Sequence, residues 1–574
     1  MPAAESNADF AEAERLKGLG NEHYAKGEYD SAHRLYSEAL EKNPNNAVYY
    51  ANRAAALLGL KKNFEAVYDC RKAIEIDPKY AKAWGRMGKA SQAMGVWDTS
   101  LTAFQKALDL LPKDNLSKAE RTAQVEYAQG IAKAKAMRSE ARTAATYHGP
   151  TDVEVGRMPW DKAAALTAKM TALCPKPSCV FILNYASEDL RNAYACMADA
   201  KIVPHPELGA EAYTASPQLM KFLSNSVLTD ERAFHVLGPG IPTFQAKLEK
   251  AVAFENGVLR GWIDNGGPAF IKKEALKRLG AESWQTVRPA ITVTVRAWIF
   301  YAFFRANLNG ENKLALEMYA NALEILEWGR KTFPDVPKED RGIIYEDSFV
   351  RGVQRLYLDA MREVCIFLLV LSNALLELII PSQDMAQFGP KSKFKYANLM
   401  TMAQDMIATV EAELPEFAAK PQHLLFQWGH WYAYWLYPRA SALANLGWCF
   451  LEQGKKRANG DPVKIQNYHT AAEYYLQATQ GFPEDDEKYI VYLRKHLDCL
   501  FAAKKPLKDT IPICRRIREA LPGVLEIWNH NPGTGTWLRG VLEEMTRFER
   551  ENSEMVAAGK LTMDSFAKHG TRLC

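Results

Sequence analysis

Small, apolar and proline positions recur every 34 residues in the first part of the chain. Four series of residues keep this step: Ala32, Ala66 and Ser100; Tyr36, Cys70 and Phe104; Ala39, Ala73 and Ala107; and Pro44, Pro78 and Pro112. In each period the small residues let two helices approach closely, the larger residue fills the next layer, and the proline ends the second helix. A fixed period of this length predicts a stack of helical hairpins with one shared core.

A fifth series marks the first helix of each hairpin, because Gly20, Ala54 and Gly88 also stand 34 residues apart. Together the series predict three helix pairs over about 13–114, and the helical pattern of 116–141 predicts one more helix that covers the open end of the stack. These positions and their spacing resemble the tetratricopeptide repeat. The resemblance implies a superhelix in which the first helix of each pair lines a concave face.

Beyond residue 142 the pattern becomes less regular. Residues 143–162 combine turn formers with irregular polarity, which is typical of a linker, and Pro and Gly then punctuate short helical stretches. The apolar run 180–183 is compatible with a short strand, but no second run of this kind accompanies it. We therefore expect no sheet in the middle region.

Repeat-like spacing returns in the second half of the chain. Residues 443–454 match the first helix of a repeat, and the second-helix pattern follows at Ala471, Tyr475 and Ala478. The interval between them is about twelve residues too long, so we expect an inserted polar loop over 455–466. The same second-helix pattern occurs upstream at Ala315, Tyr319 and Ala322.

These patterns predict an all-α protein with an N-terminal three-repeat superhelix and a larger region of degenerate helical repeats. We assign residues 1–142 to the three repeats and their capping helix. Residues 143–290 form a linker and a helical middle region, and residues 291–574 form the degenerate array.

Composition narrows the function classes. The net charge of +4 over 574 residues is close to neutral, so no general affinity for nucleic acids or membrane surfaces is expected. The nine cysteines form no CxxC motif, which argues against a structural metal site and indicates reduced thiols. The N-terminus lacks the apolar stretch of a secretory signal, and a cytoplasmic protein is expected.

One apolar segment raises the question of a membrane span. Residues 364–380 are 17 residues long and are interrupted by Ser372, Asn373 and Glu377. A span needs roughly 20 apolar residues, so we interpret this segment as a buried helix. A membrane anchor at the same place remains the alternative.

Cations are stacked on one side of the first helix of the third repeat. Lys82 and Arg86 are four residues apart, and Lys89 follows one turn later. Like charges at this spacing repel by a few tenths of a kcal/mol on a helix, so either this face is simply solvated or an anion binds there. On the concave face these cations would meet Lys17 and Asn21 of the first repeat, with Asn52 of the second.

This set of five residues, Lys17, Asn21, Asn52, Lys82 and Arg86, resembles the dicarboxylate clamp of co-chaperone tetratricopeptide domains. The resemblance implies a partner, the C-terminal Glu-Glu-Val-Asp tail of cytosolic heat-shock protein 70 or 90. Lys17, Asn21, Asn52 and Lys82 would then hold the terminal Asp, and Arg86 would reach the neighbouring carboxylate or main chain. Tyr24 and Lys89 are expected as secondary contacts to the residues upstream in the peptide.

The C-terminal half does not repeat this clamp, because Ala444 and Trp448 stand at the positions equivalent to Lys17 and Asn21. Seven aromatic residues are concentrated in 426–438. At helical spacing such residues are more often core than site, but exposed ones would form an apolar surface for a second, unidentified protein.

No motif of an enzyme is present in the sequence. The Gly-rich stretch 530–537 lacks the Lys-Ser/Thr of a phosphate-binding loop, and a turn with a helix N-cap is the expected structure. His423 and His430 are seven residues apart, which is not the spacing of a metal pair. We therefore expect no cofactor, no metal and no catalytic function. A co-chaperone or adaptor is favoured, with a membrane-attached import receptor or a scaffold with a vestigial clamp as alternatives.

Overall fold

The structure is a computed structural model of the chain. It describes residues 2–94, 96–144, 156–170, 177–205, 210–236, 240–263, 266–375, 396–418, 426–531 and 534–566. The chain divides into two compact units. Unit 1 consists of Met1–Tyr147 and Leu259–Arg341, and unit 2 consists of His148–Val258 and Gly342–Cys574.

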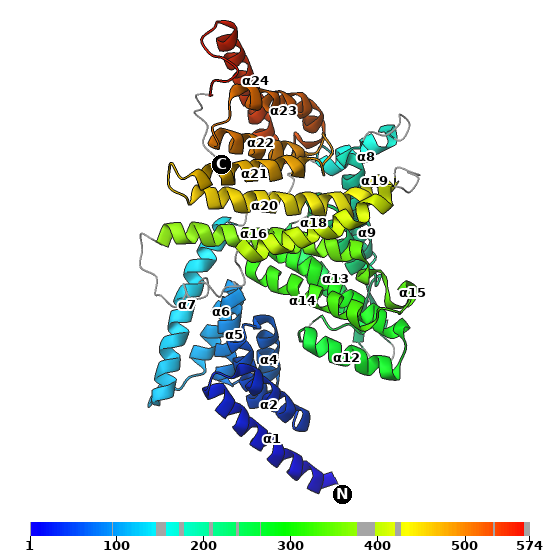
Figure 1. The fold of residues 1–574 in the computed structure, drawn as a ribbon. Coiled ribbons are helices and arrows are strands. Elements are labelled where there is room, and N and C mark those ends of the chain that lie inside the picture. The colour runs from blue at the N-terminus through cyan, green and yellow to red at the C-terminus, as the bar shows by residue number, and fades with distance from the viewer. Residues whose placement is uncertain are drawn as a thin grey trace. The chain divides into compact units, whose positions relative to one another are not determined.

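The N-terminal segment of unit 1 is a run of antiparallel helices, drawn from blue to cyan in Figure 1. They are α1 (Pro2–Ala25), α2 (Tyr29–Lys42), α3 (Ala47–Gly59), α4 (Asn63–Ile76), α5 (Ala81–Met94), α6 (Trp97–Asp109) and α7 (Lys118–Ala144). Each helix packs on the next one along the chain. The three pairs predicted from the 34-residue step are therefore present, and α7 covers the end of the stack on α6.

The small residues of the repeat meet the large ones as the pattern predicts. A Cβ atom added to Gly20 would lie 2.6 Å from the Tyr36 ring, and one added to Gly88 would lie 2.7 Å from the Phe104 ring. Both rings are buried. The two helices of the first and third pairs can approach this closely only because glycine stands at the crossing.

The second segment of unit 1 packs on α4. It comprises α12 (Pro268–Ala281), α13 (Trp284–Asn309), α14 (Asn312–Thr332) and α15 (Lys338–Arg341). The Phe64 N–H, at the start of α4, donates to the Glu317 carboxylate of α14, and the Phe64 ring lies edge-on to Trp298 at 5.9 Å. Tyr68 of α4 contacts Phe270 of α12. The predicted boundary at residue 290 falls inside α13, which continues through Pro289.

Unit 2 is also built mainly from helices. Before the second-half repeats it contains α8 (Pro159–Met170), α9 (Cys179–Ala198), β1 (Lys201–His205), β2 (Ala210–Thr214), α10 (Leu219–Asp230), η1 (Glu231–Ala233) and α11 (Ile241–Val258). It continues with η2 (Ile343–Tyr345), α16 (Asp347–Leu375), α18 (Tyr396–Ala418), α19 (Phe426–Trp431) and the π-helical turn η3 (Tyr432–Leu436). The last helices are α20 (Tyr437–Lys455), α21 (Pro462–Thr479), α22 (Glu487–Ala502), α23 (Leu507–Trp528) and α24 (Thr534–Ala557).

The all-α prediction is confirmed apart from one small ribbon. Residues 180–183 lie in α9 and are helical, whereas β1 and β2 form a two-stranded antiparallel sheet in register Lys201↔Thr214. The expectation of no sheet in this region is therefore wrong. Strands of five residues, one of them containing Pro204, are too short for alternation to be recognised in the sequence.

The repeat-like helices of the second half pack as the sequence pattern indicates. A Cβ atom on Gly447 of α20 would lie 3.2 Å from the Tyr475 ring of α21, which reproduces the crossing in the first repeat. The polar insertion is shorter than expected, because α21 already begins at Pro462. Asp461 caps this helix by accepting from the Val463 N–H at 2.9 Å, and proline is favourable in the first turn.

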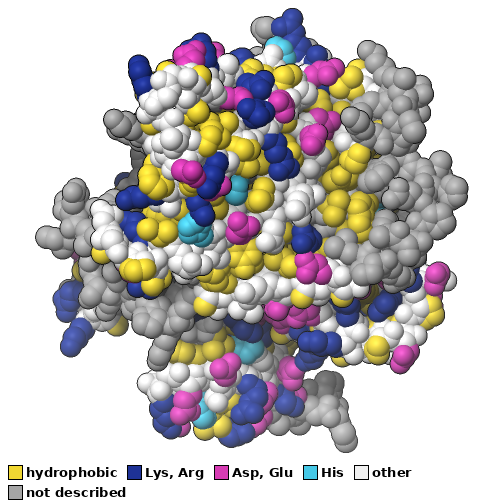
Figure 2. Space-filling view, turned by 45° about the horizontal axis from the view of Figure 1, so that its top comes forward, with side chains coloured by type: hydrophobic (Ala, Val, Ile, Leu, Met, Phe, Trp, Pro, Cys, Tyr) yellow, Lys and Arg dark blue, Asp and Glu magenta, His cyan; other side chains and the backbone are white. Residues whose placement is uncertain are grey.

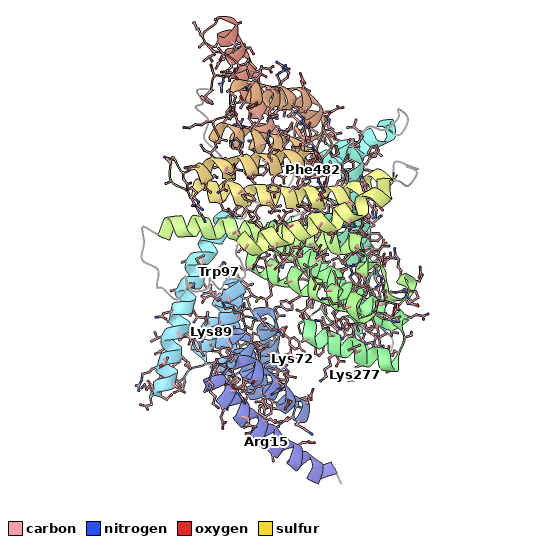
Figure 3. All side chains as sticks on the ribbon, viewed as in Figure 1. Arg15, Lys72, Lys89, Trp97, Lys277 and Phe482 are labelled. Atoms are coloured by element: carbon pink, nitrogen blue, oxygen red, sulfur yellow. The ribbon has the colours of Figure 1, made fainter. Side chains whose placement is uncertain are left out.

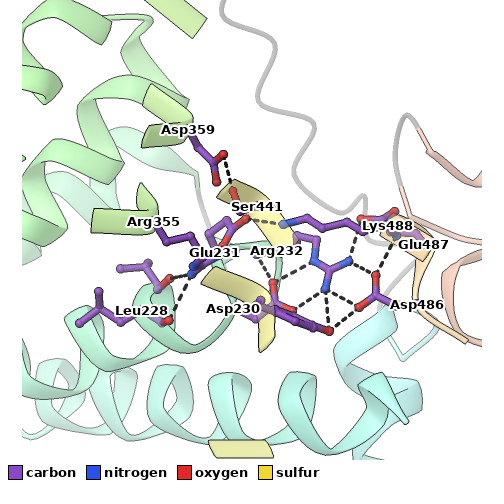
Figure 4. A network of polar contacts seen from close by, with 12 residues as sticks. Leu228, Asp230, Glu231, Arg232, Arg355, Asp359, Ser441, Asp486, Glu487 and Lys488 are labelled. Atoms are coloured by element: carbon purple, nitrogen blue, oxygen red, sulfur yellow. Dashed lines mark hydrogen bonds and ion pairs between the residues drawn. The ribbon is translucent and has the colours of Figure 1, made fainter. Parts of the chain in front are cut away.

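A buried ionic network joins η1 to the start of α22 within unit 2. Figure 4 shows Arg232 between Asp230 and Asp486. The guanidinium donates to Asp230 at 2.7 and 2.9 Å and to Asp486 at 2.7 and 2.8 Å, and it stacks on the Trp528 ring at 4.6 Å. Burial alone would raise the pKa of Asp486, but the Arg232 charge and hydrogen bonds hold that pKa below its ordinary value.

A second part of the same network reaches α16. Glu231 forms an ion pair with the buried Arg355 and accepts from the Lys488 ammonium at 2.9 Å. Arg355 also donates to the Leu228 carbonyl at 3.1 Å, at the end of α10. The network thus fixes η1 against two helices that are more than a hundred residues away in the sequence.

Charge on the surface is mixed in sign. On the face shown in Figure 2, dark blue and magenta side chains are interspersed among the hydrophobic ones and do not gather into one large patch. This distribution agrees with the small net charge of +4.

Candidate functional site

Five polar residues of the predicted clamp come from the first helices of the three pairs. Lys17 and Asn21 stand on α1, Asn52 on α3, and Lys82 and Arg86 on α5. The spacing of four residues places the two members of the α1 pair, and of the α5 pair, on one side of their helix. Which of the five the fold brings together follows from their hydrogen bonds.

A chain of hydrogen bonds links the three first helices. The Arg86 guanidinium donates to the Asn52 Oδ1 at 3.2 Å, and the Asn52 Nδ2 donates to the Asn21 Oδ1 at 3.2 Å. The Tyr36 hydroxyl of α2 donates to the same Asn21 oxygen at 2.8 Å. Asn21, Asn52 and Arg86 therefore lie together, and the side-chain amides are fixed in orientation before any ligand binds.

Tyr36 is a neutral donor in a buried environment. Burial raises the pKa of its hydroxyl to about 12, although the nearby Arg86 charge acts in the opposite direction. A neutral hydroxyl with a fixed acceptor keeps the Asn21 amide nitrogen turned away from it. The sequence pattern identified Tyr36 only as a packing residue, so its second role was missed.

The two lysines of the set differ in their surroundings. Lys82 is exposed and makes no hydrogen bond or ion pair within the described part of the chain. Lys17 forms an ion pair with Glu14 on the preceding turn of α1, and the Tyr49 hydroxyl donates to the other Glu14 oxygen at 2.6 Å. The hydrogen bonds from Lys17 and Tyr49 lower the pKa of the Glu14 carboxyl.

The two residues expected as secondary contacts are in different situations. Tyr24 is 39% exposed and lies edge-on to the Tyr29 ring at 5.4 Å. Lys89, labelled in Figure 3, forms an ion pair with Glu126 of α7 at 2.6 Å. Tyr24 is accessible to a ligand, whereas Lys89 already has a carboxylate partner.

This arrangement suits a small, doubly charged carboxylate ligand. Lys82 offers three donors, Arg86 has used one of its five, and the amide donors of Asn21 and Asn52 stand between α1 and α5. Charge-assisted hydrogen bonds from such donors are shorter and stronger than neutral ones.

The aromatic run 426–438 lies mostly in the core where it is described. Tyr432, Tyr434 and Tyr437 are buried, and the Trp435 Nε1–H donates to the Glu413 carboxylate at 2.9 Å. The side chains of 426–428 lie outside the described residues. Ala444 and Trp448, at the positions equivalent to Lys17 and Asn21, are buried as well.

Other candidates from the sequence are accounted for as follows. Residues 364–375 belong to α16 and 376–380 lie outside the described residues; no helix in the described ranges is long and apolar enough to cross a membrane. His423 lies outside the described residues, and within them no group of His, Cys, Asp or Glu could hold a metal ion. In the 530–537 stretch, of which 532–533 are not described, Asn531 donates to the Thr534 hydroxyl at 2.6 Å at the start of α24.

Comparison with known proteins identifies the repeats. Residues 13–46 match the family model described as "Tetratricopeptide repeat". The chain is 37% identical over 113 residues to the small glutamine-rich tetratricopeptide repeat-containing protein 2 of Mycosarcoma maydis. The matched stretch is 20% of this chain and 32% of that protein. The protein of the same name from Saccharomyces cerevisiae is 45% identical over 100 residues, which is 17% of this chain and 29% of that protein.

Human serine/threonine-protein phosphatase 5 is 35% identical over 119 residues, which is 20% of this chain and 24% of that protein. The chain thus matches about a third or less of the length of these relatives. A solved structure titled "TPR2B-domain:pHsp70-complex of yeast Sti1" is 32% identical over 22% of this chain and 99% of that chain, with a TM-score of 0.21, a value too low to argue from the superposition. The chain therefore carries tetratricopeptide repeats homologous to those of known repeat proteins.

Proposed function

We propose that the protein is a cytosolic co-chaperone or adaptor that binds the C-terminal Glu-Glu-Val-Asp tail of heat-shock protein 70 or 90 through Lys17, Asn21, Asn52, Lys82 and Arg86. The observation that carries the proposal is the hydrogen-bonded series from Arg86 through Asn52 to Asn21, with Lys82 one turn before Arg86 and without a partner among the residues that the structure describes. The homology of the repeats to those of the small glutamine-rich proteins supports it.

The chemistry of the ligand follows from the donors. A C-terminal Asp carries two carboxylates within a few ångströms, and two adjacent cations with two amides supply donors for both. Recognition of a C-terminal carboxylate is a recurring mode of peptide binding. Because few side chains meet a short, flexible tail whose ordering costs entropy, the affinity is expected to be micromolar, about −8 kcal/mol.

The adaptor role requires a second partner for the C-terminal region, and we propose a protein. Tyr432, Tyr434 and Tyr437 of the aromatic run 426–438 are buried, so these three residues do not contribute to its binding surface. The mechanism is binding without catalysis.

The test is a titration of the full-length protein with a labelled peptide that ends in Glu-Glu-Val-Asp, beside the same peptide with an amidated C-terminus. We expect the peptide with a free C-terminal carboxylate to bind with micromolar affinity, and we expect amidation to weaken this affinity at least tenfold. We expect Lys82→Ala to weaken the affinity for the free-acid peptide by about tenfold or more, because a charge-assisted hydrogen bond to a carboxylate is lost.

The matched control is Lys106→Ala, which removes one exposed cation from α6, the second helix of the same repeat. Its affinity stays within twofold of the wild type. Equal and negligible binding of both peptides by the wild-type protein would contradict the proposed function, and the search would move to unit 2.

A further inference from the structure

Lys17 differs from the other two cations of the clamp because it already has a carboxylate. Glu14 and Lys17 are three residues apart on α1 and form an ion pair, whereas Arg86 bonds an amide oxygen and Lys82 has no partner within the described residues. A peptide carboxylate that reaches Lys17 therefore meets a resident anion.

Glu14 is held in place from a second helix. Tyr49 of α3 is fully buried, and its hydroxyl donates to the Glu14 Oε1 at 2.6 Å while the Glu14 Oε2 faces Lys17. One carboxylate is thus shared between a fixed hydroxyl and a flexible ammonium. The hydrogen bond from Tyr49 restricts the position of the Glu14 carboxylate, and the flexible Lys17 side chain adjusts to that position.

The ion pair remains within reach of a ligand. The Lys17 side chain is 26% exposed and the Glu14 side chain is 39% exposed. A partly exposed pair of this kind contributes little stability, so its ammonium can be withdrawn at a modest cost in free energy. Lys17 can therefore exchange Glu14 for a ligand carboxylate at a modest cost in free energy.

We propose that Glu14 is a resident competitor: its carboxylate occupies Lys17 in the free protein and competes with the ligand carboxylate for the ammonium. The inference rests on the proposed function and deepens it. Lys82, Arg86 and the amides have no carboxylate partner among the described residues, whereas at Lys17 the ligand shares or displaces Glu14. Glu14 thereby lowers the affinity for acidic C-termini in general and limits tight binding to ligands that satisfy the whole set.

A purely positioning role for Glu14 predicts the opposite sign. If Glu14 served only to orient Lys17 toward the ligand, its removal would weaken binding. If Glu14 repelled the ligand through space without involving Lys17, its removal would tighten binding even when Lys17 is absent. The three roles are therefore separable by measurement.

The experiment is peptide binding by full-length Glu14→Gln, in which the Gln oxygen can still accept from Tyr49. The expected result is a two- to fivefold tighter affinity for the Glu-Glu-Val-Asp peptide, roughly the strength of a partly exposed ion pair. Lys17→Ala binds more weakly than the wild type, and Glu14→Gln in the Lys17→Ala background gives no further tightening.

The matched control is Glu12→Gln. Glu12 pairs with Arg15 at 2.7 Å at the same spacing on the same helix, and Arg15 is labelled in Figure 3. Glu12→Gln makes the same change in net charge as Glu14→Gln, and the affinity of this variant for the peptide is expected to equal that of the wild type.

Each result has a defined meaning. If the wild type binds the free acid but Glu14→Gln binds equally or more weakly, the competitor role is wrong and the proposed function stands. If the gain persists without Lys17, or if Glu12→Gln gives the same gain, occupancy of Lys17 is not the cause and the inference is overturned. If the wild type does not discriminate the free acid from the amide, the proposed function fails and the inference fails with it.

Discussion

Gly18 and Gly20 are two residues apart on α1, yet their surroundings differ completely. A Cβ atom on Gly18 would meet nothing within 4 Å, whereas one on Gly20 would lie 2.6 Å from the Tyr36 ring. Tyr36 in turn donates to Asn21. The small residue of the repeat therefore serves both packing and the orientation of the candidate clamp.

At this scale we expect Gly20→Ala to destabilise unit 1 by about 1–3 kcal/mol, because Tyr36 must move to admit the methyl group. Gly18→Ala is the matched control and stabilises by about 0.5–1 kcal/mol, since alanine is the better helix former. Denaturant unfolding of the full-length variants measures both. Equal effects of the two substitutions would show that the Gly20 crossing is looser than described.

The sequence predicted individual residues of the site unevenly. That Asn21, Asn52 and Arg86 lie together was expected from the resemblance to tetratricopeptide repeats, whose first helices line one face, and hydrogen bonds join the three residues. The parts played by Tyr36 and Glu14 could not be expected, because each depends on how a neighbouring helix stacks on α1. The Glu14–Lys17 spacing of three residues was the one signal available in the sequence.

At the scale of elements, Arg232 makes the contact in unit 2 whose removal we expect to cost stability. It joins η1 to the N-terminus of α22 through two buried carboxylates, Asp230 and Asp486. Removing one partner of a buried ion pair leaves an uncompensated charge in a poorly solvated site. Arg232 carries both of these contacts, and the Glu231–Lys488 ion pair is a second link between the same two elements.

Arg232→Met is therefore expected to destabilise unit 2 by about 3–5 kcal/mol. Arg515→Met is the control, since Arg515 is exposed and its partner Glu549 keeps Arg518 at 2.9 Å; its cost is expected to stay below about 1 kcal/mol. Urea unfolding followed by tryptophan fluorescence compares them. If Arg232→Met lowers the free energy of unfolding no more than Arg515→Met does, the network contributes to the specificity of the fold and not to its stability.

Helices with strong periodicity were predictable, and short or interrupted elements were not. The crossing of Gly447 with Tyr475 follows from the same rule as Gly20 with Tyr36. The ribbon of β1 and β2 and the passage of α13 through Pro289 do not, because strands of five residues and an interior proline carry weak local signals. In both places long-range packing outweighs local preference.

On the scale of the whole molecule, the division into units does not follow the order of the chain. Unit 1 is made of Met1–Tyr147 and Leu259–Arg341, with part of unit 2 between them in sequence. No sequence pattern indicated this, because the contacts that define it, such as Phe64 with Glu317, are 253 residues apart. Periodicity reports local structure and is silent on such pairings.

We expect a fragment of residues 1–147 to be less stable than the same fragment joined by a flexible Gly/Ser linker to residues 259–341. Without the second segment, Phe64 and Tyr68 lose their aromatic partners and the start of α4 loses its carboxylate. Thermal unfolding and size-exclusion chromatography test this. Identical melting temperatures and monomeric behaviour of both proteins would contradict the assignment of α12–α14 to unit 1.

The contact between Phe64 and Glu317 also has a consequence for biosynthesis. Its two residues leave the ribosome 253 residues apart, and at 5–20 residues per second this is an interval of about 13–50 s. Throughout that time the nascent repeats exist without the helices that will cover α4. During this interval the N-terminal repeats have the lower stability that we expect for the fragment of residues 1–147.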